Sequence, residues 1–146
     1  QLLDDPARVD LADGAALLSH GDMLCTDDIQ YMEFRAKVRA PRWAKDFLAR
    51  PLSERKAEIE ELRARSESEK SVKPAAVMDT NEAAVVDLFR TQACDRLIHG
   101  HTHRPGEHVH WVDGKRCERR VLADWYENGS YLVSNTNGIR AASWPG

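Results

Sequence analysis

The chain lacks several features that would place it in other classes of protein. It has no apolar run of the roughly 18 residues that a membrane-spanning helix needs, and residues 1–5 have neither the charged nor the apolar region of a signal peptide. Its 3 cysteines form no CxxC pair, which favours a reducing compartment over a disulfide scaffold. With 42% hydrophobic and 31% charged residues among 146, the composition is that of a globular chain with a buried core.

Acidic and basic residues nearly balance, and the resulting net charge of −3 argues against a general nucleic-acid binder. The charge is unevenly distributed, however. Residues 1–34 carry eight acids and one base, whereas residues 35–73 carry twelve bases and seven acids. This basic middle segment suits an anionic ligand or an anionic membrane surface. The alternative interpretation is an ordinary solvated helix face.

Alternating apolar residues and Asp-Gly or Asn-Gly pairs predict three β-hairpins. The first turns at Asp13-Gly14, and the other two turn at Asp113-Gly114 and Asn137-Gly138. A further short strand leads into His99. The predicted strands are residues 9–11, 15–19, 96–98, 109–112, 119–125, 131–134 and 139–143.

Capping residues and helical periodicity predict helices between these strands. Asp27 is the expected N-cap of a helix that Pro41 ends or kinks. Ser53 is the expected N-cap of a charged helix that reaches about Arg65, followed by a polar loop over residues 66–74. A capping box at residues 79–82 opens an amphipathic helix that reaches about residue 92.

Three histidines predict a metal site. His101 and His103 follow a strand and alternate in an extended segment, which places them on the same side. His20 also follows a strand and is the obvious partner from elsewhere in the chain. Neutral imidazoles suit zinc, manganese or iron. The alternative for a loop histidine is an ordinary surface residue, which is our expectation for His108 and His110.

The sequences around these histidines resemble a known family. Gly100-His101-Thr102-His103 and the upstream His20-Gly21-Asp22 are similar to the last motifs of the calcineurin-like metallophosphoesterases. Longer strings narrow the resemblance to the UDP-2,3-diacylglucosamine pyrophosphohydrolases of lipid A biosynthesis, and it covers the chain from about residue 15. The strings are residues 20–28, Tyr31, Phe34-Arg35, and residues 77–81, 97–105, 124–126 and 129–130.

The resemblance implies an enzyme with two Mn²⁺ ions. Such an enzyme cleaves the pyrophosphate of UDP-2,3-diacylglucosamine into UMP and 2,3-diacylglucosamine 1-phosphate. Paired metals activate water and stabilise the charge of an in-line displacement. By the family pattern, His20 and His101 ligate one metal and His103 ligates the other. His101 also lies close to the substrate and is the implied catalytic residue.

The resemblance also implies which residues bind the substrate. Asp28 would contact the glucosamine headgroup, with Tyr31 one helical turn away. Lysine and arginine side chains would supply positive charge to the pyrophosphate. For any one of these residues, the alternative is a surface position. The implied set is Asp28, Tyr31, Arg63, Ser66, Lys70, Lys73 and His101.

The fold implied by the resemblance is α/β, namely the C-terminal part of a four-layer αββα sandwich with a helical lid inserted at about residues 28–73. Apolar lid residues would line a channel for two acyl chains, or would simply pack the lid helices together. Basic lid residues would meet anionic headgroups, which implies a peripheral protein on the cytoplasmic face of a Gram-negative inner membrane. The apolar residues are Phe34, Val38, Trp43, Phe47, Leu48 and Leu52.

The family's DxH and GN motifs do not occur in these 146 residues, and the only Gly-Asp pair belongs to the HGD string. The missing motifs would bring a bridging aspartate and further ligands. We therefore expect residues 1–146 to be the C-terminal portion of one metallophosphoesterase domain, supplying only part of the ligands for two metals. Two alternatives follow: an incomplete fragment that only binds lipid or nucleotide sugar, or a metallophosphoesterase that acts on another phosphodiester.

Overall fold

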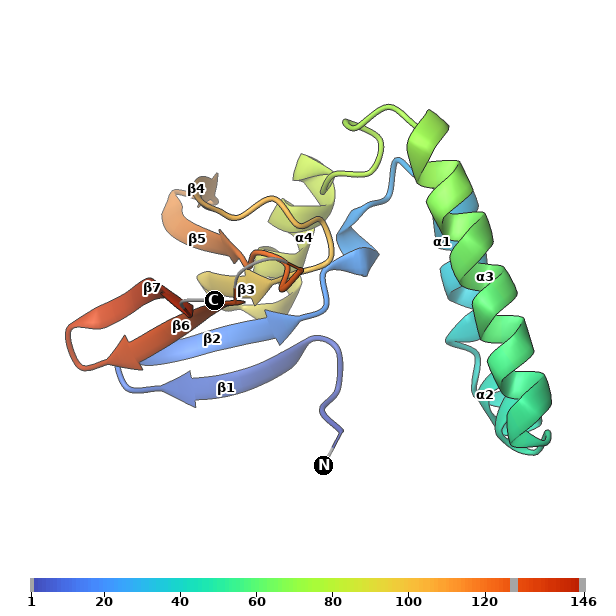
Figure 1. The fold of residues 1–146 in the computed structure, drawn as a ribbon. Coiled ribbons are helices and arrows are strands. Elements are labelled where there is room, and N and C mark those ends of the chain that lie inside the picture. Colours follow the sequence, from blue (N-terminus) through green and yellow to red (C-terminus); the bar gives the residue numbers. More distant parts are fainter. Residues whose placement is uncertain (1, 127–128, 145–146) are drawn as a thin grey trace. The chain divides into compact units, whose positions relative to one another are not determined.

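The computed structural model describes residues 2–126 and 129–144, apart from the side chain of Lys70 (Figure 1). The chain forms two compact units, a smaller unit of residues 25–79 and a larger unit made of the residues on either side. The smaller unit contains α1 (Ile29–Val38), α2 (Pro41–Leu48) and α3 (Leu52–Val72). The larger unit contains β1 (Ala7–Leu11), β2 (Gly14–Ser19), the 3-10 turn η1 (Asp22–Leu24), α4 (Glu82–Gln92), β3 (Arg96–His99), β4 (Gly106–Val112), β5 (Lys115–Val121), β6 (Gly129–Asn135) and β7 (Gly138–Trp144).

A five-stranded sheet in the order β1-β2-β3-β5-β4 organises the larger unit. The three central strands are parallel, with Leu17 of β2 opposite Leu97 of β3, and both edge strands pair antiparallel to their neighbours. The carboxyl ends of β2 and β3 therefore lie side by side at one edge of the sheet. The predicted α/β class is confirmed, as are the hairpins at Asp13-Gly14 and Asp113-Gly114.

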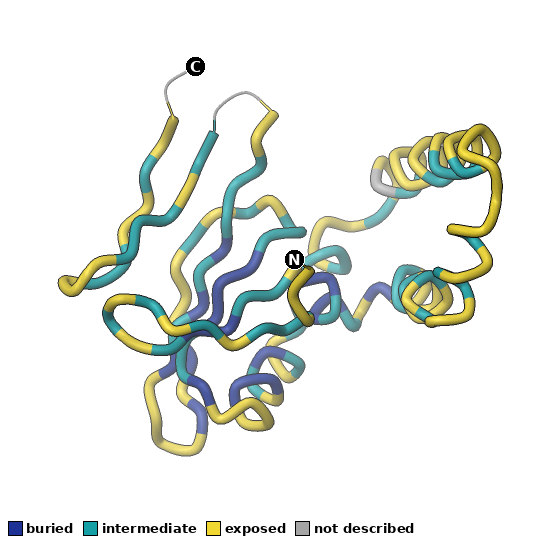
Figure 2. The backbone as a smooth tube through the Cα atoms, turned by 90° about the horizontal axis from the view of Figure 1, so that it is seen from below, coloured by how far each residue is buried: buried dark blue, intermediate teal, exposed yellow. Residues whose placement is uncertain are grey.

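Helix α4 covers one face of this sheet and builds the core. Its apolar residues Val85, Leu88 and Phe89 pack in one cluster with Leu17 and Leu97 from the strands. Figure 2 shows buried residues in the strands of the sheet and in α4, whereas α1 and α2 have no buried residue. Burial of each such apolar side chain is worth about 1.5 to 3 kcal/mol, so this cluster is what fixes the positions of β2 and β3.

The β6–β7 hairpin faces the other side of the sheet. Because side chains alternate along a strand, Leu18 and Ile98 point away from α4. They line a pocket of about 380 Å³ together with Leu132 of β6 and Ile139 of β7. The described part of the larger unit thus has one helical layer and two β layers.

The structure corrects the predicted extent of one strand. Residues 119–125 were expected to be extended, but β5 begins at Lys115 and ends at Val121. Strand β5 ends at Val121 because its partner β4 begins at Gly106, the residue that pairs with Val121. Beyond that point Leu122 still reaches β3, with its N–H donating to the carbonyl of His99 at 2.8 Å.

The helices of the smaller unit also differ from the prediction. The N-cap of α1 is Asp28 rather than Asp27, since the Asp28 side chain accepts a hydrogen bond from the N–H of Tyr31. Pro41 does not merely end a helix: it starts α2 at the first position, where a missing N–H is tolerated.

The largest error concerns residues 66–74, which were predicted to be a loop. Helix α3 instead runs to Val72, and its N-cap is Pro51 rather than Ser53. The segment is polar, but Glu and Lys are good helix formers. Glu69 also pairs with Arg65 at 2.7 Å and with Lys73 at 3.7 Å, the i,i+4 spacing that supports an exposed helix.

The three cysteines are free and buried. Burial raises the pKa of the Cys117 thiol, which disfavours the reactive thiolate. None of the described helices combines the length and the apolar character that a membrane span requires.

An ion pair between α4 and the β4–β5 turn should make stability depend on pH. Arg90 donates two hydrogen bonds of 2.9 Å to Asp113, and these bonds hold the pKa of the Asp113 carboxyl below its ordinary value. Because that pKa is lower in the folded than in the unfolded chain, the stabilisation is complete above the ordinary value and is lost as the pH falls through the lowered one.

The test is Asp113→Asn, since asparagine tolerates the left-handed φ of 52° at this position. Urea denaturation should find the variant less stable than the wild type at about pH 7, with a smaller difference at about pH 2, because the carboxyl takes up protons as the pH falls through its lowered pKa. A difference that stays constant between these pH values would contradict the role of the ion pair.

Candidate functional site

Two histidine-bearing turns meet at the carboxyl edge of the parallel strands. His20 directly follows β2, and His101 follows β3 after Gly100. The register Ser19–His99 places these strand ends next to each other. The N–H of Gly100 then donates to the carbonyl of His20 at 3.2 Å, which joins the two turns through their main chains.

The side chains of His20 and His101 lie against each other. Nδ1 of His101 is 3.1 Å from Nε2 of His20, and the ring centroids are 4.9 Å apart in an edge-to-face arrangement. His20 is exposed and His101 is half-buried, so both reach solvent. This is the pair that the spacing of the motifs predicted would come together.

His103 lies beside different residues. Its Nδ1 is 3.7 Å from a carboxylate oxygen of Asp124, and its ring meets Tyr126 edge-on with centroids 5.8 Å apart. At this distance the contact is an ion-pair contact rather than a hydrogen bond. The sequence contained Asp124 within one of the family-like strings, but its spacing did not indicate this contact.

The turn after β3 has a constrained backbone. His101 and His103 both adopt left-handed conformations, with φ of 64° and 53°. Residues other than glycine avoid this region, and such strain is concentrated at functional sites. The prediction that His101 and His103 alternate along an extended segment is therefore wrong, because both residues are left-handed, with Thr102 between them.

The donor chemistry of His20 and His101 fits a divalent transition metal, for which imidazole nitrogen is a common ligand. Among the residues that the structure describes, no three His, Cys, Asp or Glu side chains gather into one metal-binding group. The predicted ligands His20, His101 and His103 thus do not gather into one group among the described residues, and their role as metal ligands stays a prediction.

The turn of His20 is supported by Gly21 and Asp5. Gly21 has a φ of +100°, and a Cβ at this position would lie 2.5 Å from Nδ1 of His99. The Ser19 hydroxyl donates to a carboxylate oxygen of Asp5 at 2.7 Å, and the same oxygen accepts the His20 N–H at 3.3 Å. Nothing in the sequence pointed to Asp5, which lies 15 residues before the histidine that it holds.

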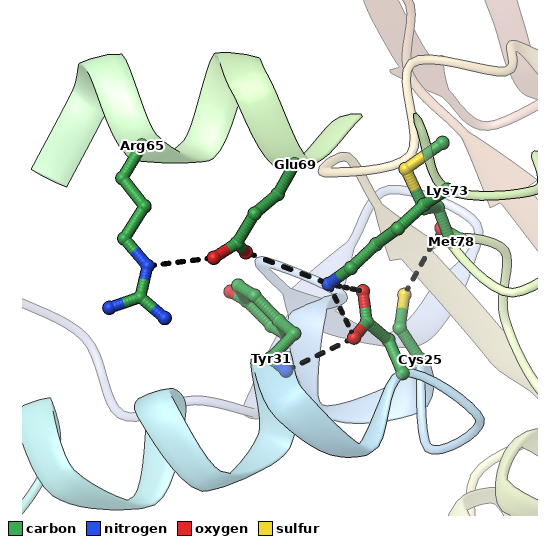
Figure 3. Close-up of polar contacts among 7 residues, drawn as sticks. Cys25, Tyr31, Arg65, Glu69, Lys73 and Met78 are labelled. Carbon is green, nitrogen blue, oxygen red and sulfur yellow. Dashed lines mark hydrogen bonds and ion pairs between the residues drawn. The ribbon is translucent and has the colours of Figure 1, made fainter. Parts of the chain in front are cut away.

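In the smaller unit, the predicted substrate residues Asp28 and Lys73 form an ion pair with each other. Nζ of Lys73 donates to both carboxylate oxygens of Asp28, at 2.8 and 2.9 Å. Figure 3 shows Lys73 and Glu69 beside Tyr31, with Arg65 at the outer end of the chain of contacts. The Arg65 guanidinium holds the pKa of the Glu69 carboxyl below its ordinary value, so this carboxyl is ionised at neutral pH.

This ion pair should contribute to stability separately from the helix cap. Asp28→Asn keeps a good N-cap for α1 but leaves the Lys73 ammonium without its carboxylate. The two side chains are 9% and 17% exposed, so we expect a loss of about 1 to 3 kcal/mol, between the values for surface and buried pairs.

Chemical denaturation followed by circular dichroism measures this loss, and Asp28→Ala should cost about 1 kcal/mol more because the cap is lost as well. The matched control is Asp46→Asn, whose partner Arg42 is 94% exposed. If Asp28→Asn and Asp46→Asn have equal small effects, the buried pair does not hold α1 and α3 together.

A cleft of about 490 Å³ lies between α1 and α3. Two of the predicted substrate residues, Tyr31 and Ser66, line it, together with Phe34 of the predicted lid. It presents charges of both signs beside aromatic surface. The lining residues are Gln30, Tyr31, Glu33, Phe34, Lys37, Leu62, Arg65, Ser66 and Glu69.

The other predicted residues of the smaller unit lie elsewhere. Arg63 is exposed on α3, and the side chain of Lys70 falls outside the described residues. Trp43 and Phe47 stack on each other in α2, with ring centroids 4.8 Å apart, and are not among the lining residues of this cleft. Arg50 lies over the Phe47 ring at 5.9 Å.

The larger unit is thus an α/β fold with a paired-histidine site at the carboxyl edge of its parallel strands, a place where ligands commonly bind in α/β proteins. No family model matches the chain. Its sequence is 52% identical to a UDP-2,3-diacylglucosamine hydrolase of Aromatoleum aromaticum over 132 residues, which is 90% of this chain and 54% of that protein.

Proteins of the same name from Bordetella pertussis and Cellvibrio japonicus are 43% and 41% identical, over 95% and 98% of this chain. The chain spans 56% and 60% of these two relatives, so it corresponds to a little over half of their length. It is homologous to the UDP-2,3-diacylglucosamine hydrolases, and the family resemblance that its motifs indicated is confirmed.

Proposed function

We propose that this chain forms part of a hydrolase that cleaves the pyrophosphate of UDP-2,3-diacylglucosamine, releasing UMP and 2,3-diacylglucosamine 1-phosphate in lipid A biosynthesis. The contact between His20 and His101 carries the proposal, because it brings two metal-binding side chains, 81 residues apart in sequence, to one edge of the sheet. The names of the homologous proteins supply the substrate. The fold belongs, in this proposal, to a four-layer αββα metallophosphoesterase sandwich.

His20 and His101 would hold one metal ion, and His103, which lies beside Asp124, would hold a second. When bound, two Mn²⁺ ions would activate water and neutralise phosphoryl charge. The protein contributes preorganisation: the left-handed turn aims His101 and His103, and the Gly100–His20 hydrogen bond fixes the distance between the two turns. His101 would also lie close to the scissile phosphate.

The smaller unit would act as a lid that binds the diacylated sugar. Tyr31 and Phe34 offer apolar surface in the cleft, and Arg65 and Lys37 offer positive charge to phosphate. Asp28 would accept hydrogen bonds from the sugar, with Lys73, Arg63, Ser66 and Lys70 around the phosphates. The excess of basic residues in 35–73 would favour an anionic surface, consistent with a peripheral protein at the cytoplasmic face of the inner membrane.

The test is UMP release in the presence of Mn²⁺. Because the chain spans about half of its relatives, the assay uses this chain alone and also a chimera preceded by the missing part of the Aromatoleum aromaticum protein. We expect the chimera to release UMP and to lose this activity with a metal chelator. A folded chimera that leaves UDP-2,3-diacylglucosamine intact but hydrolyses a simple phosphodiester would refute the substrate assignment.

A further inference from the structure

A buried line of polar side chains runs behind the histidine turns of the larger unit. His99 ends β3, Arg119 lies on β5 and His110 on β4, and these residues are only 1%, 7% and 5% exposed. Arg119 Nη1 is 3.1 Å from His99 Nε2, and Arg119 Nε is 3.3 Å from His110 Nε2. At the outer end, His110 Nδ1 is 2.7 Å from a carboxylate oxygen of Glu82, whose side chain is 72% exposed.

The hydrogen-bond partners of both histidines determine their tautomers. A guanidinium group can only donate hydrogen bonds, so the Nε2 atoms of His99 and His110 must accept them. Each ring then carries its proton on Nδ1. The Nδ1–H of His110 donates to Glu82, and the Nδ1–H of His99 donates to the carbonyl of Gly100 at 2.9 Å.

The Gly100 carbonyl connects this line to the candidate metal site. It also accepts the N–H of Thr102 at 2.8 Å, and Thr102 lies between His101 and His103. The His99 ring also packs against Gly21, next to His20. One buried imidazole therefore supports both turns that carry the predicted metal ligands.

We propose that Arg119 is a positioning residue, which fixes His99 as the Nδ1–H tautomer and thereby holds the Gly100 carbonyl and the turn of His101 and His103. Residues that support metal ligands in this way typically change metal affinity by about 10- to 100-fold when they are removed. That effect on metal affinity rests on the proposed function, whereas the tautomers and the geometry of the turn do not.

The experiment compares Arg119→Met with Arg116→Met in the metal-free chain. Methionine at position 119 has a similar length but no donor. Arg116 is the matched control, because it lies on the exposed face of β5 and pairs with Glu118 at the surface. Nitrogen-15 NMR of the imidazoles reports which nitrogen carries the proton, and hydrogen exchange of the Thr102 amide reports whether the turn is closed.

We expect Nδ1–H tautomers for His99 and His110 in the wild type and in Arg116→Met. In Arg119→Met, His99 should lose this preference and the Thr102 amide should exchange faster, with partial rescue in Arg119→Lys. Isothermal titration with Mn²⁺ should then give an affinity about 10- to 100-fold weaker in Arg119→Met than in Arg116→Met.

An Nε2–H tautomer of His99 in the wild type would overturn the proposal, as would unchanged exchange of Thr102 in a folded Arg119→Met. If no variant binds Mn²⁺, the proposed metal site fails, and the NMR measurements alone decide on Arg119. If Arg119→Met does not fold, the same NMR comparison between the wild type and Arg119→Lys decides the question.

Discussion

Replacement of Gly21 by alanine is expected to destabilise the larger unit by about 2 to 6 kcal/mol, the combined range for a disfavoured backbone conformation and an overpacked site. The backbone at this position has a φ of +100°, which side chains rarely adopt. In addition, the new methyl group would lie 2.5 Å from Nδ1 of His99 and 3.2 Å from the carbonyl oxygen of Gly100. Both groups are held in place by hydrogen bonds, His99 at the end of β3 and Gly100 in the turn after it.

A control variant separates backbone strain from steric overlap as causes of this destabilisation. Gly114 also has a positive φ, of +81°, but a Cβ there would meet nothing within 4 Å. Gly114→Ala therefore measures backbone strain alone, and urea denaturation of both variants gives the steric part by difference. Equal destabilisation in the two variants would show that the His99 ring does not pack tightly against Gly21.

The second large effect is expected from His101→Ala in the chimera described above. Because supporting residues of metal sites typically change activity by about 10- to 100-fold, loss of a metal ligand should lower the rate of UMP release by at least about 100-fold. His108→Ala is the control, since this side chain is exposed on β4 and belongs to neither histidine turn.

Titration of the same two variants with Mn²⁺ shows whether a loss of activity comes from weaker metal binding. His101→Ala should weaken Mn²⁺ binding together with the rate, whereas His108→Ala should change neither. Full activity in a folded His101→Ala protein would exclude the metal and catalytic roles given to this residue, and the contact between His20 and His101 would then be structural only.

Local signals in the sequence predicted most of the larger unit. The Asp13-Gly14 and Asp113-Gly114 turns give two of its hairpins, and the helix expected after the capping box at residues 79–82 is present as α4. Its N-cap, however, is Asn81, which accepts the N–H of Ala84, rather than Asp79, the first residue of that box. The meeting of His20 and His101 was also predictable, because both follow apolar strands. Such features depend on a few neighbouring residues, which a pattern can reveal.

Features that depend on distant residues were not predictable. Lys73 reaches Asp28 across 45 residues, and Arg119 connects His99 with His110 across two strands. The end of α3 was also missed, because a run of serine, glutamate and lysine is equally typical of a loop until its side-chain pairs are known. Periodicity reveals which face of an element is buried but not which polar groups meet there.

The separation of the two histidine turns along the chain has a consequence for folding. His20 and His101 are 81 residues apart, and the whole smaller unit lies between them. The entropy of closing so long a loop is lost before β2 and β3 pair, so this contact is expected to form after the local hairpins. The loss grows only slowly with length, by about 0.6 kcal/mol for each doubling, so insertions between the two turns should leave the histidine pair intact. Metal binding by this pair would accordingly report on completed long-range folding rather than on local structure.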